Sequence, residues 1–150
     1  MKIERTTDPV AIRAIIGHPR VKPLVLEGDD VPVPLHESIY HLLGKVGGKV
    51  AGVVCFIPVN QTAWNPHIAV LPEFNGSGAE LMREGIRWMF ENTPCTKIFA
   101  DPPEFKKLAI RVLEQCELKR EGFSPRSFLW KGVLHDRILM GLEKEQPCLG

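Results

Sequence analysis

Apolar and polar positions alternate along this chain with two different periods, and these divide it into strands and helices. The nearly continuous apolar run Val50–Ile57 follows the pair Gly47-Gly48. Because consecutive glycines supply the positive φ angles of a tight turn, we predict a β-hairpin over residues 39–59. The run is apolar enough for a strand covered on both faces. A further strand is predicted over 64–71, ended by Pro72.

Helical periodicity marks two long stretches and one short one. Residues 78–92 carry apolar side chains at steps of three and four. Residues 104–117 give the sharpest pattern, and the predicted apolar face is Phe105, Leu108, Ala109, Val112, Leu113 and Cys116. A short helix is predicted after Asp8, which can cap it, with Pro9 at its first position.

The remaining strands are short, and their order with the helices defines the fold class. We predict strands over 1–6, 97–100, 127–133 and 138–143, with His135-Asp136 as a turn. Segment 18–37, rich in proline and charge, is predicted to be a loop with one helical turn, and a candidate wall of an acceptor site. The order indicates an α/β (α+β) mixed sheet rather than a βαβ repeat. The 150 residues fit a single domain, 1–150.

Composition narrows the function classes. The formal net charge of +1 provides no strong field for nucleic acid or a membrane surface, so neither is expected as a partner. The four cysteines form no Cys-x-x-Cys pair, and no metal site is expected. No signal peptide and no apolar run of about 18 residues is present, so a cytoplasmic location is predicted.

Chemistry concentrates in the stretch Val70–Ala79. Here a predicted strand runs through the turn Gly76-Ser77-Gly78 into a long helix. The first amides of a helix lack intrahelical partners, and the helix dipole adds partial positive charge, so such a turn can bind phosphate. A tight turn without a ligand is the alternative. There is no Gly-Lys-Ser/Thr of a nucleotide-binding loop and no third glycine of a dinucleotide fold.

This stretch resembles the acetyl-CoA motif of the GNAT N-acetyltransferases. Val70-Leu71-Pro72-Glu73-Phe74 is similar to the family's Val-x-Pro-Glu-Tyr/Phe, and Gly76 and Gly78 match its glycines. Residues 104–114 are similar to the family's second motif helix, in the style of ribosomal-protein N-terminal acetyltransferases. Small GNAT-like proteins of tailed phages are also similar. The resemblance spans roughly residues 38–143.

The resemblance implies a GNAT-type fold, a site and a reaction. Strands 64–71 and 97–100 are expected side by side and parallel, splayed apart within a mostly antiparallel sheet. Acetyl-CoA is the implied co-substrate and a primary amine (protein N-terminus, lysine or small molecule) the implied acceptor, with a homodimer as a further expectation. The implied cofactor-binding residues are Val70, Leu71, Asn75, Gly76, Ser77, Gly78 and Ala79. A backbone N–H of Val70 or Leu71 would stabilise the oxyanion.

His67 is the predicted general base, since an imidazole titrates near neutral pH and can take a proton from an ammonium. Strand alternation puts His67 and Ala69 on one face, toward a cleft that Ala69 leaves open, and Ile68 and Val70 on the core face. A histidine that only hydrogen-bonds a neighbouring strand is the alternative. Weaker candidates for the base are Glu73, His41 and Glu37.

Several positions depart from the family pattern and support a second hypothesis. Glu73 replaces a Gln or Arg, Asn75 and Ser77 replace basic neighbours, and Leu113 stands where many members carry a general-acid tyrosine. Tyr40, the one tyrosine, is predicted to be a packed ring. The alternative function is a catalytically silent GNAT-like binding or structural protein, such as a phage accessory protein.

Overall fold

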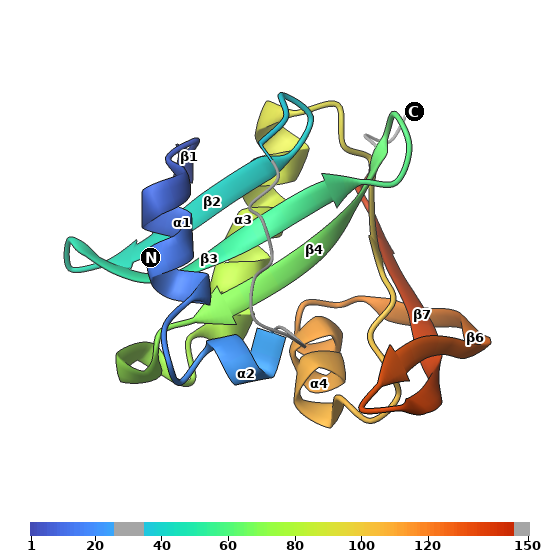
Figure 1. Cartoon of the computed structure of the whole chain (residues 1–150). Coiled ribbons are helices and arrows are strands. Elements are labelled where there is room, and N and C mark those ends of the chain that lie inside the picture. Colours follow the sequence, from blue (N-terminus) through green and yellow to red (C-terminus); the bar gives the residue numbers. More distant parts are fainter. Residues whose placement is uncertain (26–34, 146–150) are drawn as a thin grey trace, which may run out of the picture.

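In the part of the chain that the structure describes, one seven-stranded sheet organises the fold (Figure 1). The computed structural model describes residues 1–25 and 35–145. Its strands are β1 (Lys2–Thr6), β2 (Tyr40–Val46), β3 (Lys49–Pro58), β4 (Ala63–Val70), β5 (Lys97–Ala100), β6 (Lys119–Trp130) and β7 (Val133–Glu143). They lie in the order β1-β2-β3-β4-β5-β7-β6, and every neighbouring pair is antiparallel except β4–β5, which is parallel.

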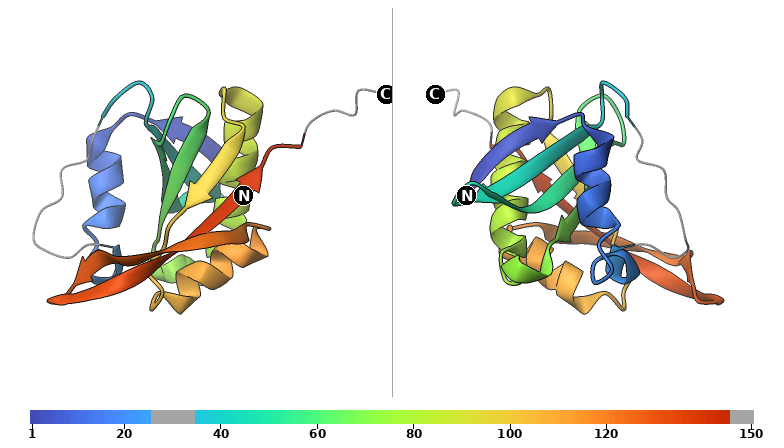
Figure 2. Two further views of the ribbon diagram at one scale, coloured as in Figure 1. Left: turned by 90° about the vertical axis from the view of Figure 1, so that its right-hand side faces the viewer. Right: turned by 60° about the vertical axis from the view of Figure 1, so that its left-hand side comes forward.

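Helices cover both faces of the sheet. Helix α1 (Pro9–Ile16) lies on one face and helix α3 (Gly78–Asn92) on the other, as the two views of Figure 2 show. Helix α4 (Lys107–Gln115) contacts α3, and the short helix α2 (Lys22–Val25) follows α1. The β6–β7 hairpin extends outward beyond the body of the molecule (Figure 2).

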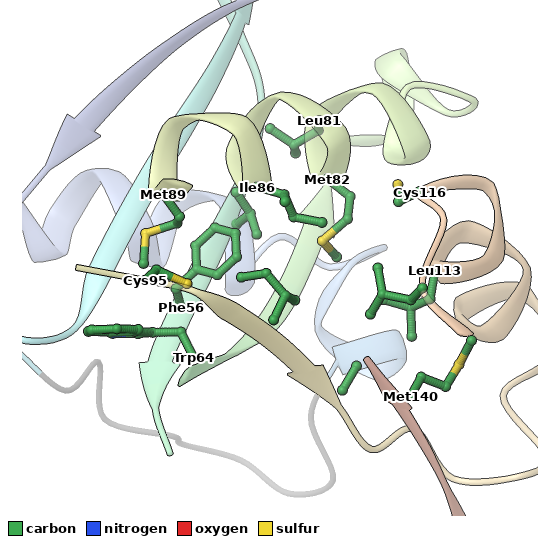
Figure 3. Packing of buried hydrophobic residues seen from close by; sticks show 14 of the residues in the cluster. Phe56, Trp64, Leu81, Met82, Ile86, Met89, Cys95, Leu113, Cys116 and Met140 are labelled. Atoms are coloured by element: carbon green, nitrogen blue, oxygen red, sulfur yellow. The ribbon is translucent and has the colours of Figure 1, made fainter. Parts of the chain in front are cut away.

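The main core fills the space between the sheet and helices α3 and α4. Met82, Ile86 and Met89 of α3 point toward Phe56 and its neighbours on the sheet (Figure 3). A second, smaller cluster lies between the sheet and α1, and consists of Ile15, Val21, Leu43, Val53 and Ala69. The central strand β3 therefore contributes to both layers, as its apolar run predicts.

The strongest sequence patterns are confirmed. Helix α3 and strand β5 have the predicted bounds, and the parallel neighbours β4 and β5 are side by side. The β2–β3 turn places Gly47 and Gly48 at φ angles of 56° and 80°. The Asp8 carboxylate accepts a hydrogen bond from the Val10 N–H at 2.9 Å, which caps α1.

The predicted apolar face of the second long helix is wrong in part. Helix α4 begins at Lys107 rather than at Glu104, because the preceding residues turn after Pro103. The side chains that meet the core also differ from the predicted face. Leu108 is 72% exposed, whereas Ile110, outside the predicted face, is buried.

The last two strands are longer than predicted. They form one hairpin whose turn lies at Lys131-Gly132, with φ angles of 49° and 78°. His135 and Asp136 therefore lie within β7 and do not form the turn. In the predicted loop 18–37, α2 supplies the helical turn, and residues 26–34 lie outside the described part of the chain.

Candidate active site at the end of strand β4

Strands β4 and β5 pair only at their beginnings. Ala63 pairs with Lys97 and Trp64 with Ile98, although β4 continues to Val70. The next β4 residue whose backbone faces β5 is Pro66, which has no N–H to donate. Proline therefore ends the parallel ladder and leaves the second half of β4 without a backbone partner on this edge. This agrees with the splayed pair that the sequence predicts.

The ladder with β3 fixes which β4 amides point toward this unpaired edge. The Leu71 N–H donates to the Ala51 carbonyl at 2.8 Å. Because an antiparallel strand alternates between paired and outward-facing amides, the Val70 N–H faces the β5 edge. Of the two predicted oxyanion donors, Val70 is therefore geometrically available, and Leu71 is not, since its N–H is used by the sheet.

A glycine turn connects β4 to α3 at the same end of the strand. A 3-10 turn, Pro72–Phe74, leads to Gly76, whose φ of 99° is one that side chains rarely adopt. Helix α3 starts at Gly78, and the Ser77 side chain does not cap it. The first amides of α3, those of Gly78 and Ala79, therefore point out of the helix without an intrahelical acceptor.

The space around the two glycines of this turn is open. A Cβ placed on Gly76 would meet nothing within 4 Å, and one on Gly78 would meet only Val70 Cγ2 and Val112 Cγ2 at 3.9 Å. Asn75 and Glu73 are exposed, and Ser77 and Ala79 are half-buried. The seven predicted cofactor-binding residues thus lie together, at the junction of one strand end with one helix start.

His67 lies on β4 opposite Cys55 of β3, with an exposed side chain. Its surroundings lower the pKa of the imidazole below its usual value. Partial loss of hydration, around a ring that still keeps exposed surface, is the largest cause; the Asp101 carboxylate opposes it, and Arg137 and Lys106 reinforce it. A lowered pKa keeps the imidazole neutral at pH 7, which is the form that accepts a proton.

The predicted open cleft beside Ala69 is not found. Ala69 is 6% exposed and packs in the small cluster under α1 with Val21 and Val53. Ile68 and Val70 pack against the main core, as predicted. The alternation of faces is therefore right, but α1 and the residues after it cover Ala69, so only His67 of this face stays exposed.

Three polar side chains near His67 were not identified from the sequence. The Asn65 amide donates to Asp101 Oδ1 at 2.8 Å, and Arg137 Nη1 donates to Asp101 Oδ2 at 2.9 Å. Asn65 lies on β4, Asp101 directly follows β5, and Arg137 lies on β7. The available signal was weak: a polar residue in an apolar strand, and an aspartate directly after the strand expected to splay.

The other candidate bases lie elsewhere. His41 is 3% exposed on β2 and has no surface for an acceptor. Glu37 is exposed before β2, where its carbonyl oxygen accepts a hydrogen bond from Arg5. Glu73 is exposed in the 3-10 turn.

The candidates for thiol or hydroxyl chemistry are packing residues. Tyr40 packs against Trp64 and Trp88, with ring centroids 6.2 and 5.8 Å away. Cys116 is buried, and its thiol donates to the Ala79 carbonyl. Leu113, which stands where many family members carry a general-acid tyrosine, is also buried in the main core.

Neither a metal cluster nor a membrane span is found in the described ranges. Within residues 1–25 and 35–145, no three His, Cys, Asp or Glu side chains come close enough together to hold a metal ion. In the same ranges no helix is both long enough and apolar enough to cross a bilayer.

A mixed sheet with one parallel, diverging pair and a glycine turn at its end is the architecture expected of a GNAT-type fold, and comparison with known proteins identifies the family. A family model described as the acetyltransferase (GNAT) family matches residues 18–117. The chain therefore belongs to the GNAT acetyltransferase family, which groups it with the N-acetyltransferases that use acetyl-CoA. No curated protein sequence gives a match.

Solved structures support the fold. A variant of the spermidine N-acetyltransferase SpeG from Vibrio cholerae superposes with a TM-score of 0.78 at 15% identity, covering 95% of each chain. A chimera of the Vibrio cholerae enzyme and hSSAT gives a TM-score of 0.77 at 15% identity, over 95% of this chain and 96% of the other. The Vibrio cholerae enzyme in complex with CoA and spermine gives 0.65 at 19% identity, over 71% and 66%. At these identities the likeness concerns the fold.

Proposed function

We propose that this protein transfers the acetyl group of acetyl-CoA to a primary amine by direct attack, at the unpaired edge of β4. One observation carries the proposal. Backbone pairing between β4 and β5 stops at Trp64. Beyond that point lie the Val70 N–H, at the end of β4, and the start of α3, which follows β4 through the glycine turn. An outward-facing amide at a strand end and a helix N-terminus after it suit a cofactor whose thioester and pyrophosphate are joined by an extended pantetheine arm.

The cofactor would be held mainly by backbone. The amides of Gly76, Gly78 and Ala79 would face the pyrophosphate, with Leu71, Asn75 and Ser77 contributing contact at the turn. The Ser77 N–H itself donates to the Phe74 carbonyl at 3.0 Å. The Val70 N–H would donate to the thioester oxygen, where negative charge develops during attack. Side-chain charge supplies little of this binding, since Asn75 and Ser77 stand where basic residues are usual.

The acceptor must lose a proton before it attacks. An alkyl ammonium with a pKa near 10.4 is neutral in roughly one molecule in a thousand at pH 7.4, equivalent to about 4 kcal/mol. A protein N-terminus with a pKa near 7.8 is neutral in roughly a quarter of molecules. A neutral His67, directly or through water, would take this proton, and lysine-like acceptors would depend on it more than N-terminal ones.

The acceptor class is the open part of this proposal. The structural neighbours are named for spermidine and spermine, while the second motif helix is similar to that of enzymes acting on ribosomal-protein N-termini. Polyamines, N-terminal peptides and lysine peptides therefore form the test panel. A cytoplasmic location and a homodimer accompany the proposal, and sedimentation analysis tests the latter.

A thiol-release assay tests the function. The protein is incubated with acetyl-CoA and each acceptor, and free CoA thiol is measured against a sample without acceptor. We expect acceptor-dependent release with at least one amine class, and less release from the His67→Ala variant. Mass spectrometry of the acceptor should show the added acetyl group. Absence of turnover with every amine class would contradict catalysis.

A catalytically silent GNAT-like protein, such as a phage accessory protein, is the second candidate. The observation in its favour is that Leu113 is buried in the core and the Tyr40 ring is packed between two tryptophans. The chain's one tyrosine therefore cannot protonate a leaving thiolate. Binding of acetyl-CoA without turnover would select this function.

A further inference from the structure

The point where β4 and β5 part is bridged by side chains. Asn65 follows the last β4 residue paired with β5, and Asp101 follows the last residue of β5. Continued pairing would put Asn65 opposite Phe99, but its amide reaches two residues further, to Asp101 Oδ1 at 2.8 Å. The Asn65–Asp101 hydrogen bond therefore ties the two strands together just where their backbones stop pairing.

Arg137 holds Asp101 from the other side. Its Nη1 donates to Asp101 Oδ2 at 2.9 Å and to the Asp101 carbonyl at 3.3 Å. Its Nε donates to the Ser127 carbonyl at 3.2 Å, and its guanidinium lies 4.9 Å from the Phe128 ring centroid. With three acceptors and an aromatic face, this side chain has little freedom to move.

The backbone around Arg137 is shaped to receive it. The β6–β7 register shifts between Ser124 and Phe128, and Arg126 within this bulge has a φ of 50°. The bulge lies next to the Ser127 carbonyl that Arg137 uses. Bulges of this kind redirect side chains beside functional sites.

Holding the sheet together does not require these three residues. Strand β5 pairs with β7 along its whole length, from Lys97–Glu143 to Ala100–Met140. The side-chain bonds add a connection only at the end where β4 departs. Since Asp101 and Arg137 are both partly buried, with side chains 26% and 29% exposed, water screens their pairing less than it would on an open surface.

Asp101 and Arg137 are also among the charges that act on His67. Lys106, just before α4, is the third, and all three act from outside β4. Cys55, opposite His67 on β3, contributes no charge, because burial raises the pKa of its thiol to about 11. The carboxylate and the guanidinium of one ion pair thus influence the candidate base in opposite directions.

We propose that Asn65, Asp101 and Arg137 form a positioning cluster for the transfer reaction. The cluster fixes the separation of β4 and β5 where the thioester would enter, and Asn65 anchors it to the face of β4 that also carries His67. None of the three takes part in bond making; they act through the placement of the strands and of the base. The inference rests on the proposed function of His67 and of the β4 edge.

Two variants that break the same ion pair distinguish this role from a structural one. In Asp101→Asn the carboxylate is lost and the arginine stays, so the His67 titration should move to lower pH. In Arg137→Gln the arginine is lost and the carboxylate stays, so it should move to higher pH. The measurement is an NMR titration of the His67 ring, assigned with His67→Gln. Shifts in the same direction, or none, would overturn the proposal.

A charge-conserving variant covers the case in which one of these proteins fails to fold. Arg137→Lys keeps the positive charge but loses the forked hydrogen bonds. It should leave the His67 titration near that of the wild type and lower kcat. Thermal melts establish that each titrated variant is folded.

Asn65→Ala tests the positioning of the strands without changing any charge. It should lower kcat by about tenfold while the KM for acetyl-CoA stays within about twofold, because misplaced reacting groups slow chemistry more than binding. An unchanged kcat would remove Asn65 from the cluster. The NMR titration needs neither acetyl-CoA nor an acceptor, so it can fail while the proposed transfer activity stands, and the reverse.

Discussion

At the scale of single residues, the direction of each β4 peptide group decides what the site can do. The Leu71 N–H is used by the sheet, whereas the Val70 N–H faces the edge that β5 leaves. A strand pattern read from sequence separates side-chain faces but not backbone edges. For this reason the sequence leaves Val70 and Leu71 as equal candidates, and the ladder with β3 decides between them.

Val70→Pro removes this donor without removing a bond to β3. Pro66 already occupies the same edge of the same strand, so we expect the variant to fold. Turnover should fall by about 10²–10³, the usual cost of losing one oxyanion donor. The control, Leu71→Pro, removes the bond to Ala51 and should lower the melting temperature. A Val70→Pro protein that melts normally and turns over at the wild-type rate would exclude the Val70 amide.

His67→Ala should lower turnover by roughly tenfold or more at neutral pH and leave acetyl-CoA affinity nearly intact. The lowered pKa of His67 gives the sign of the pH dependence: the base is neutral and active above its pKa, and kcat/KM falls only as the pH drops below the usual histidine range. The variant should lose this acidic limb. Equal rates for both proteins across about pH 6–9 would remove His67 from the mechanism.

The side of a strand or helix on which a side chain lies could be predicted where the bounds of that strand or helix were predicted correctly. In β4 the alternation of His67 and Ile68 follows directly from the sequence. In α4 the same reasoning failed in part, because the core lies on the side of Ile110 rather than of Leu108, and the helix starts three residues later than predicted. The cover over Ala69 comes from residues far away in sequence, which no local pattern contains.

At the scale of elements, α3 both packs the core and begins at the glycine turn. Its bounds were predictable because glycine, a long amphipathic repeat and a following polar segment agree. The bounds of the β6–β7 hairpin could not be predicted in this way. Most side chains of its outer half are exposed, and Pro125 interrupts the alternation of apolar and polar residues. Exposed strands lack the strict alternation that a buried face imposes.

Gly85 on α3 is required by close packing of the helix on β3. A Cβ there would lie 2.7 Å from Val54 Cγ1 and 3.3 Å from Phe56 Cε2, and both side chains are fully buried. Helix propensity favours alanine by about 1 kcal/mol, but overpacking costs about 1–3 kcal/mol. Gly85→Ala should therefore lower the free energy of unfolding by up to about 2 kcal/mol in urea melts.

The matched control for this prediction is Glu91→Ala, at an exposed position of the same helix. It should change stability by less than about 0.5 kcal/mol. If Gly85→Ala were as stable as the wild type, α3 would have room to move away from the sheet, and the close approach would carry no cost.

At the scale of the whole molecule, the order of the strands could not be derived from local patterns. Adjacency of β4 and β5 followed from the family resemblance and is confirmed. Composition and periodicity alone predict a mixed sheet but not the order of its strands. The Asn65–Asp101–Arg137 cluster depends on three elements meeting, so the sequence could not identify it before the topology was known.

Stability should depend on pH through His41. Burial, and then Arg5, lower the pKa of this histidine below 6.5 in the folded protein. Below pH 6.5 the unfolded chain therefore binds more protons, and the free energy of unfolding falls as the pH falls through the folded-state pKa. Urea melts at about pH 7.5 and 5.5 should show a smaller loss for His41→Gln than for the wild type. An equal loss in both proteins would assign the pH dependence to other groups.

The central claim is that the turn between β4 and α3 binds acetyl-CoA, and titration calorimetry tests it most directly. The wild type should bind one acetyl-CoA per chain, and Gly78→Asp should abolish binding because it places a carboxylate at the phosphate position. Aspartate is favourable at a helix start, so this variant should melt close to the wild type. Gly78→Ala, whose Cβ meets only ordinary contacts, is the uncharged control and should retain more affinity than Gly78→Asp. No binding by the wild type, or equal binding by Gly78→Asp, would contradict the account.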